Sequence, residues 1–308
     1  MKKLISTRNM DKAEWLCHRK KGIGGSDAGA VCGLNPYRSA MEVYLDKTTD
    51  DTEEFDNEAM RQGREFEDYV AKRFMEETGK KVRRAGAMFY DEAYPWMLAD
   101  VDRLVVGERA GLECKTASPF MAKHWEDGKI PIHYQIQCAH YMQVCHVDAW
   151  YIAVLIYGRE FKYYRMERDE AMLADLVKIE SDFWNNHVLK RVLPAPDGSE
   201  AADTAISAYF GASRAETIPL VGFDDRLKRR QELLEEMERM ETEKRQIEQE
   251  LKVYLGEISS AENENYRVSW KSVSMNRLDE KRLKEEKPDI YDQYKREISS
   301  RRFSVKAA

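Results

Sequence analysis

The chain has 308 residues, of which 43% are hydrophobic and 10% aromatic, and its formal net charge is −6. This composition supplies enough apolar surface for a substantial buried core, which excludes a disordered tail. The longest apolar run, residues 149–157, is too short to cross a bilayer, and residues 1–15 lack an apolar stretch of signal-peptide length, so we expect a cytoplasmic protein with no membrane contact.

The N-terminal part of the sequence reads as helix, loop, helix. A short helix is predicted over residues 12–19, then the glycine-rich loop GIGGSDAGAVCGLNPY at 22–37, then a helix over 40–46. Glycines allow the backbone of such a loop to present N–H groups to an anion. A tight turn that caps a helix with Ser26 or Asp27 is the structural alternative, and both interpretations are compatible.

A polar link rich in Asp, Thr and Glu leads to an amphipathic helix, predicted over residues 61–79 and ended by Gly79. Helical spacing places Glu67 on or beside the apolar face of this helix. Because burial of a lone ionised carboxylate is costly, Glu67 should reach solvent, pair with a basic residue, or bind a metal ion.

Strands are predicted next, near residues 81–89, 98–106 and 111–117. Side chains alternate across a strand, so Glu113 and Lys115 share one face, and a turn at 107–111 sets Asp102 across from or diagonal to them. Two carboxylates and one ammonium on one patch suit a hard divalent cation with a water beside it. A solvent-facing hairpin with alternating charges is the other interpretation of this segment.

The following elements complete an α/β pattern. They are a helix from Pro131 to about Val144, strands at 149–157 and 160–166, and a helix over 170–189. Strands with helices between and over them predict an α/β or α+β fold, in which a central mixed β-sheet is flanked by helices. We expect this domain to span residues 1–193, and residues 194–222, rich in Pro, Gly and small side chains, to form a linker.

Residues 223–308 are predicted to form a helical, coiled-coil-like segment with a small β extension. A 4-3 apolar spacing, interrupted by Lys244, is kept by Leu233, Met237, Met240, Ile247, Leu251 and Tyr254. The spacing fits a helix that lies back on the first domain as well as a helical hairpin or an oligomer contact. The remainder predicts a basic strand–helix–strand cap, since residues 220–264 are mainly acidic and residues 265–308 mainly basic.

Five motifs in fixed order resemble one protein family. They are GIGGSDAGAVCGLNPY, the G-x-x-x-E of Gly63–Glu67, LADVDRLV, GLECK and QIQCAHYMQV, and their order and spacing resemble the YqaJ-like viral recombinase and lambda exonuclease family of the PD-(D/E)xK nuclease superfamily. The resemblance covers roughly residues 12–190. It implies a restriction-endonuclease-like nuclease core and a phage or prophage exonuclease in a bacterial host cell. Such enzymes degrade double-stranded DNA from its ends, 5′→3′, and leave a 3′ overhang for an annealing protein of the RecT or Beta type.

The resemblance assigns roles to individual catalytic positions. Glu67 matches the helix carboxylate of the family, Asp102 the aspartate of the PD half-motif, and Glu113 with Lys115 the E-x-K pair. Gln137 matches a glutamine on the helix after the catalytic strand. A hydrogen bond from Gln137 to backbone inside the core is the structural alternative.

The same resemblance bears on further positions. The residue before the aspartate is Val101 rather than proline, and Asp100 becomes a lesser candidate ligand. Near the N-terminus, Trp15, Arg19 and Ser26 match family positions of which the arginine and serine hold the 5′-terminal phosphate. A guanidinium fork, a hydroxyl and exposed backbone N–H groups suit a phosphate.

These assignments predict metal-dependent hydrolysis of a phosphodiester. Glu67, Asp102, Glu113 and the Cys114 carbonyl are expected to coordinate one or two Mg²⁺ ions, for which Mn²⁺ would substitute. Lys115 is expected to position the attacking water and offset charge in the transition state, or to act as a base if its pKa is depressed. Family relatives form rings around DNA, so a homo-oligomer is expected.

Three other functions compete with this interpretation. The same fold serves site-specific endonucleases, and a non-catalytic DNA-binding recombination accessory protein would use the coiled segment and the basic tail. An iron–sulfur nuclease would need a cluster of four cysteines. The five cysteines form no CxxC pair, which argues against clusters, zinc ribbons and secreted disulfides and predicts reduced thiols.

Overall fold

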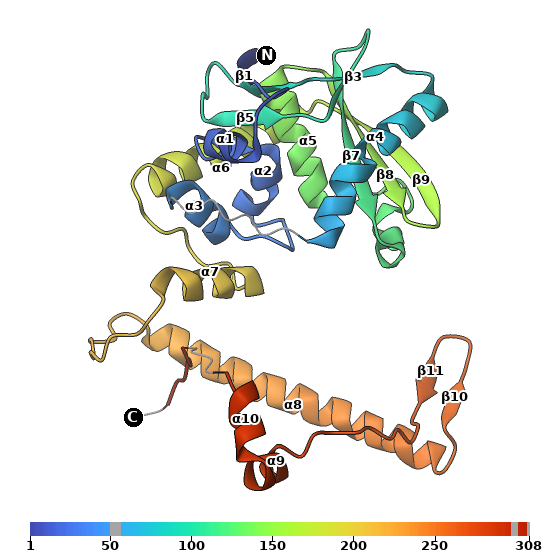
Figure 1. The fold of residues 1–308 in the computed structure, drawn as a ribbon, viewed down its shortest axis with the longest axis vertical. Coiled ribbons are helices and arrows are strands. Elements are labelled where there is room, and N and C mark those ends of the chain that lie inside the picture. The colour runs from blue at the N-terminus through green and yellow to red at the C-terminus, as the bar shows by residue number, and fades with distance from the viewer. Residues whose placement is uncertain (50–56, 297–300, 307–308) are drawn as a thin grey trace. The chain divides into compact units, whose positions relative to one another are not determined.

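The computed structural model describes residues 1–49, 57–296 and 301–306, and it divides into two compact units, Met1–Gly211 and Ala212–Ala308 (Figure 1). The polar link predicted before the helix of Glu67 lies mostly outside the described residues. The first unit contains a five-stranded sheet with the strand order β3-β6-β7-β8-β9. Its strands are β3 (Val82–Arg84), β6 (Arg103–Val105), β7 (Ala110–Ala117), β8 (Ala149–Ile156) and β9 (Glu160–Glu167). Only β7 and β8 pair in parallel, so the sheet is mixed, and the predicted fold class is confirmed.

A second, four-stranded sheet has the order β1-β4-β5-β2. Its strands are β1 (Lys2–Ser6), β4 (Ala87–Tyr90), β5 (Met97–Asp100) and β2 (Ile23–Gly24), and β1 was not expected from the sequence. Two predicted strands, 81–89 and 98–106, were wrong as single strands, because in each the chain leaves one sheet and enters the other. The second of these crossings lies at residues 101–102, immediately before β6.

Seven helices in the described part of the first unit surround these sheets. They are α1 (Lys12–Arg19), α2 (Gly25–Val31), α3 (Ala40–Thr48), α4 (Glu58–Thr78), α5 (Ile132–Cys145), α6 (Glu170–Asp182) and α7 (Glu200–Phe210), with a 3-10 segment η1 (Pro119–Trp125) and a π-helical segment η2 (Phe183–Val188). Gly79, with φ 70°, ends α4 as predicted. The glycine-rich loop was predicted wrongly at its centre, which is helix α2. Gly24 rather than Ser26 or Asp27 is the N-cap, and the Asp27 side chain accepts a hydrogen bond from its N–H.

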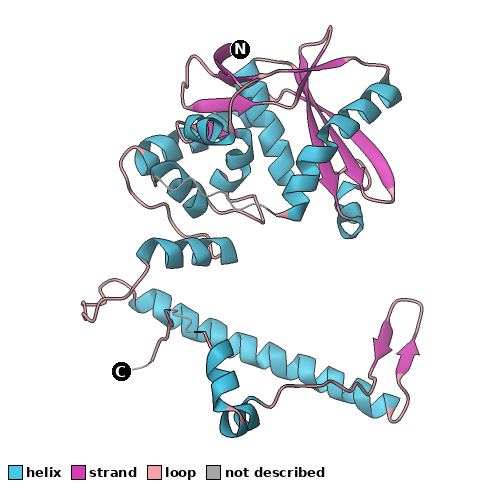
Figure 2. Ribbon diagram, in the orientation of Figure 1, coloured by secondary structure: helices cyan, strands magenta, loops and turns pink. Residues whose placement is uncertain are grey.

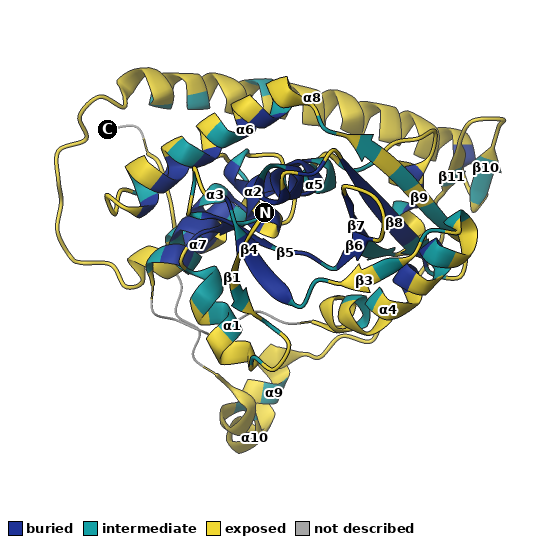
Figure 3. Cartoon of the chain, turned by 90° about the horizontal axis from the view of Figure 1, so that it is seen from above, coloured by how far each residue is buried: buried dark blue, intermediate teal, exposed yellow. Residues whose placement is uncertain are grey.

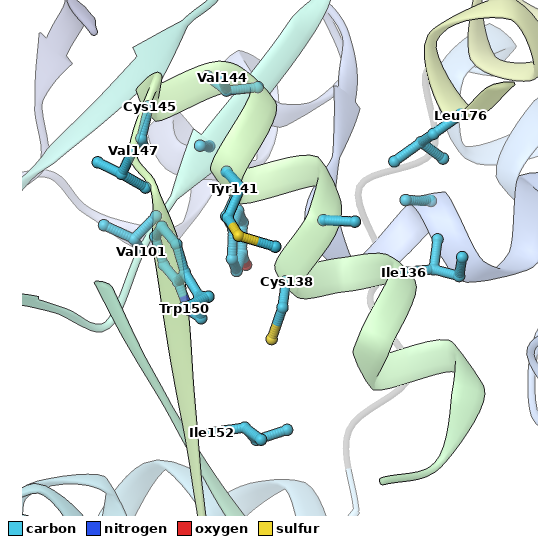
Figure 4. Packing of buried hydrophobic residues seen from close by; sticks show 14 of the residues in the cluster. Val101, Ile136, Cys138, Tyr141, Val144, Cys145, Val147, Trp150, Ile152 and Leu176 are labelled. Atoms are coloured by element: carbon cyan, nitrogen blue, oxygen red, sulfur yellow. The ribbon is translucent and has the colours of Figure 1, made fainter. Parts of the chain in front are cut away.

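Helices α4 and α5 cover opposite faces of the five-stranded sheet. Phe74 of α4 packs in one apolar cluster with Leu112 and Tyr151. Ile136 and other α5 residues pack in another cluster with Trp150 and Ile152, as Figure 4 shows. Because alternate residues of β7 and β8 serve the two clusters, each strand presents one set of side chains to α4 and the other to α5.

Gly25 has no side chain, which allows α2 to approach α5 closely. A Cβ at Gly25 would lie 2.4 Å from Cε1 of Tyr141, whereas at Gly24 the nearest atom lies 3.6 Å away. We expect Gly25→Ala to lower the free energy of unfolding by about 1–3 kcal/mol through overpacking. Urea denaturation of Gly25→Ala beside Gly24→Ala tests this. Equal stability losses for the two variants would contradict the role of this contact.

The predicted linker contains a helix. Residues 200–210 form α7, in which Ala202 and Ala205 are buried, and α7 packs on α3 in the first unit. The first compact unit accordingly extends beyond residue 193, to Gly211. Small residues suggested a flexible segment, but here they form the buried face of a helix, which begins with the capping side chain of Ser199.

The second unit consists of a long helix, a hairpin and two short helices. The elements are α8 (Asp224–Leu255), β10 (Ser260–Glu262), β11 (Arg267–Ser269), α9 (Glu280–Glu286) and α10 (Pro288–Tyr294) (Figure 2). The predicted strand–helix–strand cap was wrong: β11 pairs with the preceding β10 across a turn held by the Asn263 side chain, and residues 301–306 form no strand.

Burial differs sharply between the elements. Strands β5 and β8 are largely buried and the first half of β7 is buried, whereas α8 is exposed along almost its whole length (Figure 3). None of the helices in the described ranges is long and apolar enough to cross a membrane. All five cysteines are free.

Candidate active site

The hairpin of β6 and β7 brings together the acidic residues predicted from the sequence. Arg103 pairs with Leu112 in the antiparallel register, so Asp102 lies opposite Glu113. The main-chain N–H of Cys114 donates a hydrogen bond to Oδ2 of Asp102 at 2.8 Å. The predicted position of Asp102 beside the E-x-K segment is confirmed.

Glu113 and Lys115 share the face of β7 that meets α5. The Lys115 ammonium lies 2.6 Å from Oε1 of Glu113 and 4.7 Å from the ring centroid of Tyr134. The Gln137 side chain donates to the same Oε1 at 2.7 Å and to the Tyr141 hydroxyl at 3.0 Å. Gln137 therefore contacts the acidic cluster, and its alternative role of bonding only to backbone is not what the structure shows.

One carboxylate oxygen of this cluster could still accept a hydrogen bond or bind a cation. Glu113 is 3% exposed, and its Oε2 has no hydrogen-bond partner among the described residues. A buried carboxylate oxygen without a partner is costly, so Oε2 fits an additional donor or a cation.

Glu67, on helix α4, has a basic partner. The buried guanidinium of Arg103 bonds to the carboxylates of Glu67 and Asp68, and donates to the Asp102 carbonyl at 2.7 Å. Of the three outcomes expected for Glu67, the structure thus shows pairing with a basic residue. Sequence reasoning missed Arg103, although the single basic residue in the segment LADVDRLV, which also holds Asp100 and Asp102, was a signal of a buried ion pair.

The carboxylates nevertheless act on one another electrostatically. Burial, together with the negative charges of Glu113 and Glu67, raises the pKa of Asp102 well above its usual value, although Lys115 and the Cys114 N–H act in the opposite direction. Within the described ranges, no group of three or more His, Cys, Asp and Glu side chains is already arranged around a metal position. The donor types and the unpartnered Glu113 oxygen still fit a hard divalent cation, whereas Glu67 is turned toward Arg103.

The surroundings of Lys115 favour its protonated form. Desolvation lowers the pKa of its ammonium, but Glu113, Tyr134 and Asp102 outweigh desolvation and raise the pKa above the usual value. The sequence left open whether Lys115 acts as a base or as a cation. The structure favours a cation that donates hydrogen bonds.

A second group of predicted residues lies beside α1 and α2. Arg19 donates to the Ser26 hydroxyl at 2.9 Å, and its guanidinium lies 4.7 Å from the ring centroid of Trp15. The indole N–H of Trp15 donates to Oδ2 of Asp100 at 2.6 Å. Asp100, a lesser candidate ligand, is instead used to hold Trp15, and it connects this group to the acidic cluster two residues along the chain.

The buried Asp27 organises the cations of this second group. Its carboxylate contacts the guanidinium of Arg38, lies 2.8 Å from the Lys47 ammonium and lies 3.6 Å from Arg19. Burial opposes ionisation, but these three cations outweigh it and lower the pKa of Asp27 far below its usual value. From the sequence Asp27 was only a candidate helix cap, because the spacing gave no sign of its distant partners.

Comparison with known proteins adds an independent finding. Residues 14–148 match the family described as the YqaJ-like viral recombinase domain. The chain is 38% identical over 308 residues to the uncharacterized protein YqaJ of Bacillus subtilis strain 168, an alignment that covers 98% of this chain and 97% of that protein.

Solved structures show the same fold. The chain is similar to two crystal structures of LHK-Exo, an alkaline exonuclease from Laribacter hongkongensis, one of them in complex with dAMP. Each has a TM-score of 0.51 and covers 58% of this chain and 93% of the other, at 22% and 21% identity.

Proposed function

Because the chain belongs to the family of YqaJ-like viral recombinase domains, we propose that it is a metal-dependent 5′→3′ exonuclease for double-stranded DNA that leaves 3′ overhangs. The observation that carries the proposal is the buried Glu113 carboxylate, which has one oxygen held by Lys115 and Gln137 and the other without a partner in the part of the chain that the structure describes. If Glu113 served only in a structural ion pair, burial of its second oxygen without a hydrogen bond would be unexplained. The fold of an alkaline exonuclease supports the same conclusion.

In this proposal, Asp102, Glu113 and the Cys114 carbonyl would hold one or two Mg²⁺ ions, or Mn²⁺ in their place, and Glu67 would join them by exchanging its contact with Arg103 for the ion. When bound, such an ion supplies Lewis acidity that activates water and stabilises charge on the scissile phosphate. Gln137 keeps the Glu113 carboxylate oriented. Arg103, which contacts Glu67 and the Asp102 carbonyl, sets the spacing between α4 and β6.

Lys115 has the role of a fixed cation. Its ammonium lies against Glu113 and the face of Tyr134, so it is oriented before substrate binds. It donates hydrogen bonds to the attacking water and to a non-bridging phosphate oxygen as negative charge develops there.

Arg19 and Ser26 bind the 5′-terminal phosphate and so restrict hydrolysis to DNA ends. Their side chains are already in contact, and the Asp27 carboxylate lies 3.6 Å from the Arg19 guanidinium. A prearranged guanidinium and hydroxyl suit a phosphate monoester, because both donate hydrogen bonds to its oxygens.

The partners follow from the same activity and the family. We propose that the protein acts in the cytoplasm of a bacterial host on behalf of a phage or prophage, as a homo-oligomer around DNA. The 3′ overhang would then load an annealing protein of the RecT or Beta type. Sedimentation of the chain with and without duplex tests the oligomer directly.

The decisive experiment uses linear duplex labelled separately at each end, with and without Mg²⁺, beside a covalently closed circle. We expect Mg²⁺-dependent loss of the 5′-terminated strand and no cutting of the circle. Cutting of the closed circle would indicate an endonuclease of the same fold. Retained biological function in Glu113→Ala without Mg²⁺ would indicate a non-catalytic DNA-binding protein.

Arg19→Ala should reduce the preference for phosphorylated ends. Loss of a charge-assisted hydrogen bond costs about 1.5–3 kcal/mol, which corresponds to about a 10- to 100-fold lower kcat/KM on 5′-phosphoryl ends. On 5′-hydroxyl ends the variant and the wild type should differ little. Arg109→Ala is the control, because the Arg109 side chain is 69% exposed and pairs with Asp148 and the main-chain carbonyl of His146. An unchanged ratio between the two ends would remove Arg19 from phosphate recognition.

A further inference from the structure

Helix α8 of the second unit carries an apolar strip that the described residues of that unit leave uncovered. The strip consists of Leu233, Met237, Met240, Ile247, Leu251 and Tyr254, with Lys244 in the middle. Met237 and Met240 are each 63% exposed and Tyr254 is 81% exposed. Leu255 is the only buried residue of the helix. A long helix with an exposed 4-3 strip is typical of one that pairs with another helix.

The positions that flank the strip on both sides are almost uniformly acidic. They carry Glu236, Glu241, Glu243, Glu248 and Glu250, and the two exceptions are Leu234 and Leu255. The basic residues in this part of α8 lie elsewhere on the helix, at Arg239, Arg245 and Lys252 on the outer face and Lys244 within the strip. We call the five glutamates the acidic flanks.

The acidic flanks disfavour pairing of α8 with a second copy of itself. In a parallel pair, Glu236 of one copy would face Glu241 of the other, and Glu243 would face Glu248. In an antiparallel pair each flank would face its own counterpart, so glutamate would again meet glutamate. Like charges at these positions destabilise a coiled coil in either orientation.

The basic C-terminal part of the chain does not occupy the strip either. Within the described ranges, residues 256–296 and 301–306 leave the apolar side chains of the strip exposed. The occupant that the charges fit is therefore a helix from another protein.

We propose that α8 is the docking surface for a partner helix with an apolar 4-3 strip flanked by Lys and Arg. Each acidic flank then meets a cation, and burial of the apolar strip supplies most of the affinity. Lys244 interrupts the strip and lies 2.8 Å from Glu241, so the partner should present a polar or acidic residue opposite Lys244, which would set the register. The docking surface does not depend on the nuclease chemistry.

Two synthetic helices test the proposal on the full chain. They share apolar strip positions over about four heptads and differ only in carrying Lys or Glu at every flanking position. By isothermal titration calorimetry we expect the Lys peptide to bind about tenfold or more tightly than the Glu peptide, with a difference that shrinks as salt rises. A scrambled Lys peptide of the same composition controls for non-specific attraction to an acidic protein.

Matched variants test whether the preference for the Lys peptide depends on the acidic flanks. Glu243→Lys with Glu248→Lys should abolish or reverse the preference, whereas Glu235→Lys with Glu238→Lys, the same change of charge on the outer face, should preserve it. Equal binding of the two peptides, or no binding, would overturn the proposal. So would self-association of the wild-type chain that is lost in Met240→Asp with Ile247→Asp. Exonuclease activity measured on the same variants shows whether the proposed function fails separately.

Discussion

Lys115→Ala should lose hydrolysis while the protein still binds DNA. Removal of one preorganised charged donor at a hydrolytic site lowers kcat by about 10²- to 10⁴-fold. DNA affinity should change little, because the phosphate contacts proposed for Arg19 and Ser26 are not touched. Single-turnover hydrolysis of a labelled duplex gives the rate, and fluorescence anisotropy gives the affinity.

Two companion variants separate chemistry from structure in this test. Lys115→Arg keeps the positive charge but changes the geometry, and should recover only part of the rate. Lys129→Ala removes an exposed lysine whose side chain is 69% accessible, and should hydrolyse DNA like the wild type. Wild-type turnover in Lys115→Ala would remove Lys115 from the mechanism.

The second large effect is expected from Asp27→Asn, which should lower the free energy of unfolding by about 3–5 kcal/mol. Asp27 is fully buried, and the Lys47 ammonium beside it is buried as well. Loss of the carboxylate leaves the cations of Lys47 and Arg38 without their buried partner, and such an uncompensated charge is strongly destabilising. Urea denaturation at neutral pH measures the loss.

The contribution of Asp27 to the free energy of unfolding should also be lost in acid. Its pKa in the folded protein is lowered, so the ionised form favours folding at every pH above the ordinary value of about 4. As the pH falls below about 4, the unfolded chain takes up a proton that the folded protein does not, and the difference between wild type and Asp27→Asn should shrink steadily. A difference that is constant from pH 7 to pH 3 would contradict an ionised Asp27.

Asp46→Asn provides the matched control for this prediction. Asp46 contacts the same two cations, with its carboxylate 2.9 Å from Lys47 and 3.4 Å from Arg38, but its side chain is 33% exposed. Solvent screens this pair, so we expect a loss of about 1 kcal/mol or less. A similar loss for both variants would show that burial is not what makes Asp27 important.

The local structure around the candidate site could largely be predicted from the sequence. The alternation of side chains on β7 places Glu113 and Lys115 on one face wherever the strand packs, and a short turn places Asp102 opposite. Helical periodicity likewise places Glu67 beside the apolar residues of α4. These features depend on backbone geometry over a few residues, which the order of residues alone determines.

The errors in the predicted secondary structure came from contacts between residues that are distant in sequence. The strands predicted at 81–89 and 98–106 each divide between two sheets, and the small residues near 200–210 form a helix that packs on α3. Pairing partners of a strand or a helix lie far away in the chain. Local pattern therefore shows that a segment is extended or helical, without showing which sheet or helix it joins.

By itself the sequence determined the chemical types at the site, their family order and their local faces. Only the tertiary structure decided that Arg103 pairs with Glu67, that Asp27 lies beside three cations, and that the Lys115 ammonium lies against Glu113 and the ring of Tyr134. The reason is physical: the ionisation and orientation of a buried side chain depend on burial and on charges within a few ångströms, and most of these belong to residues distant in sequence.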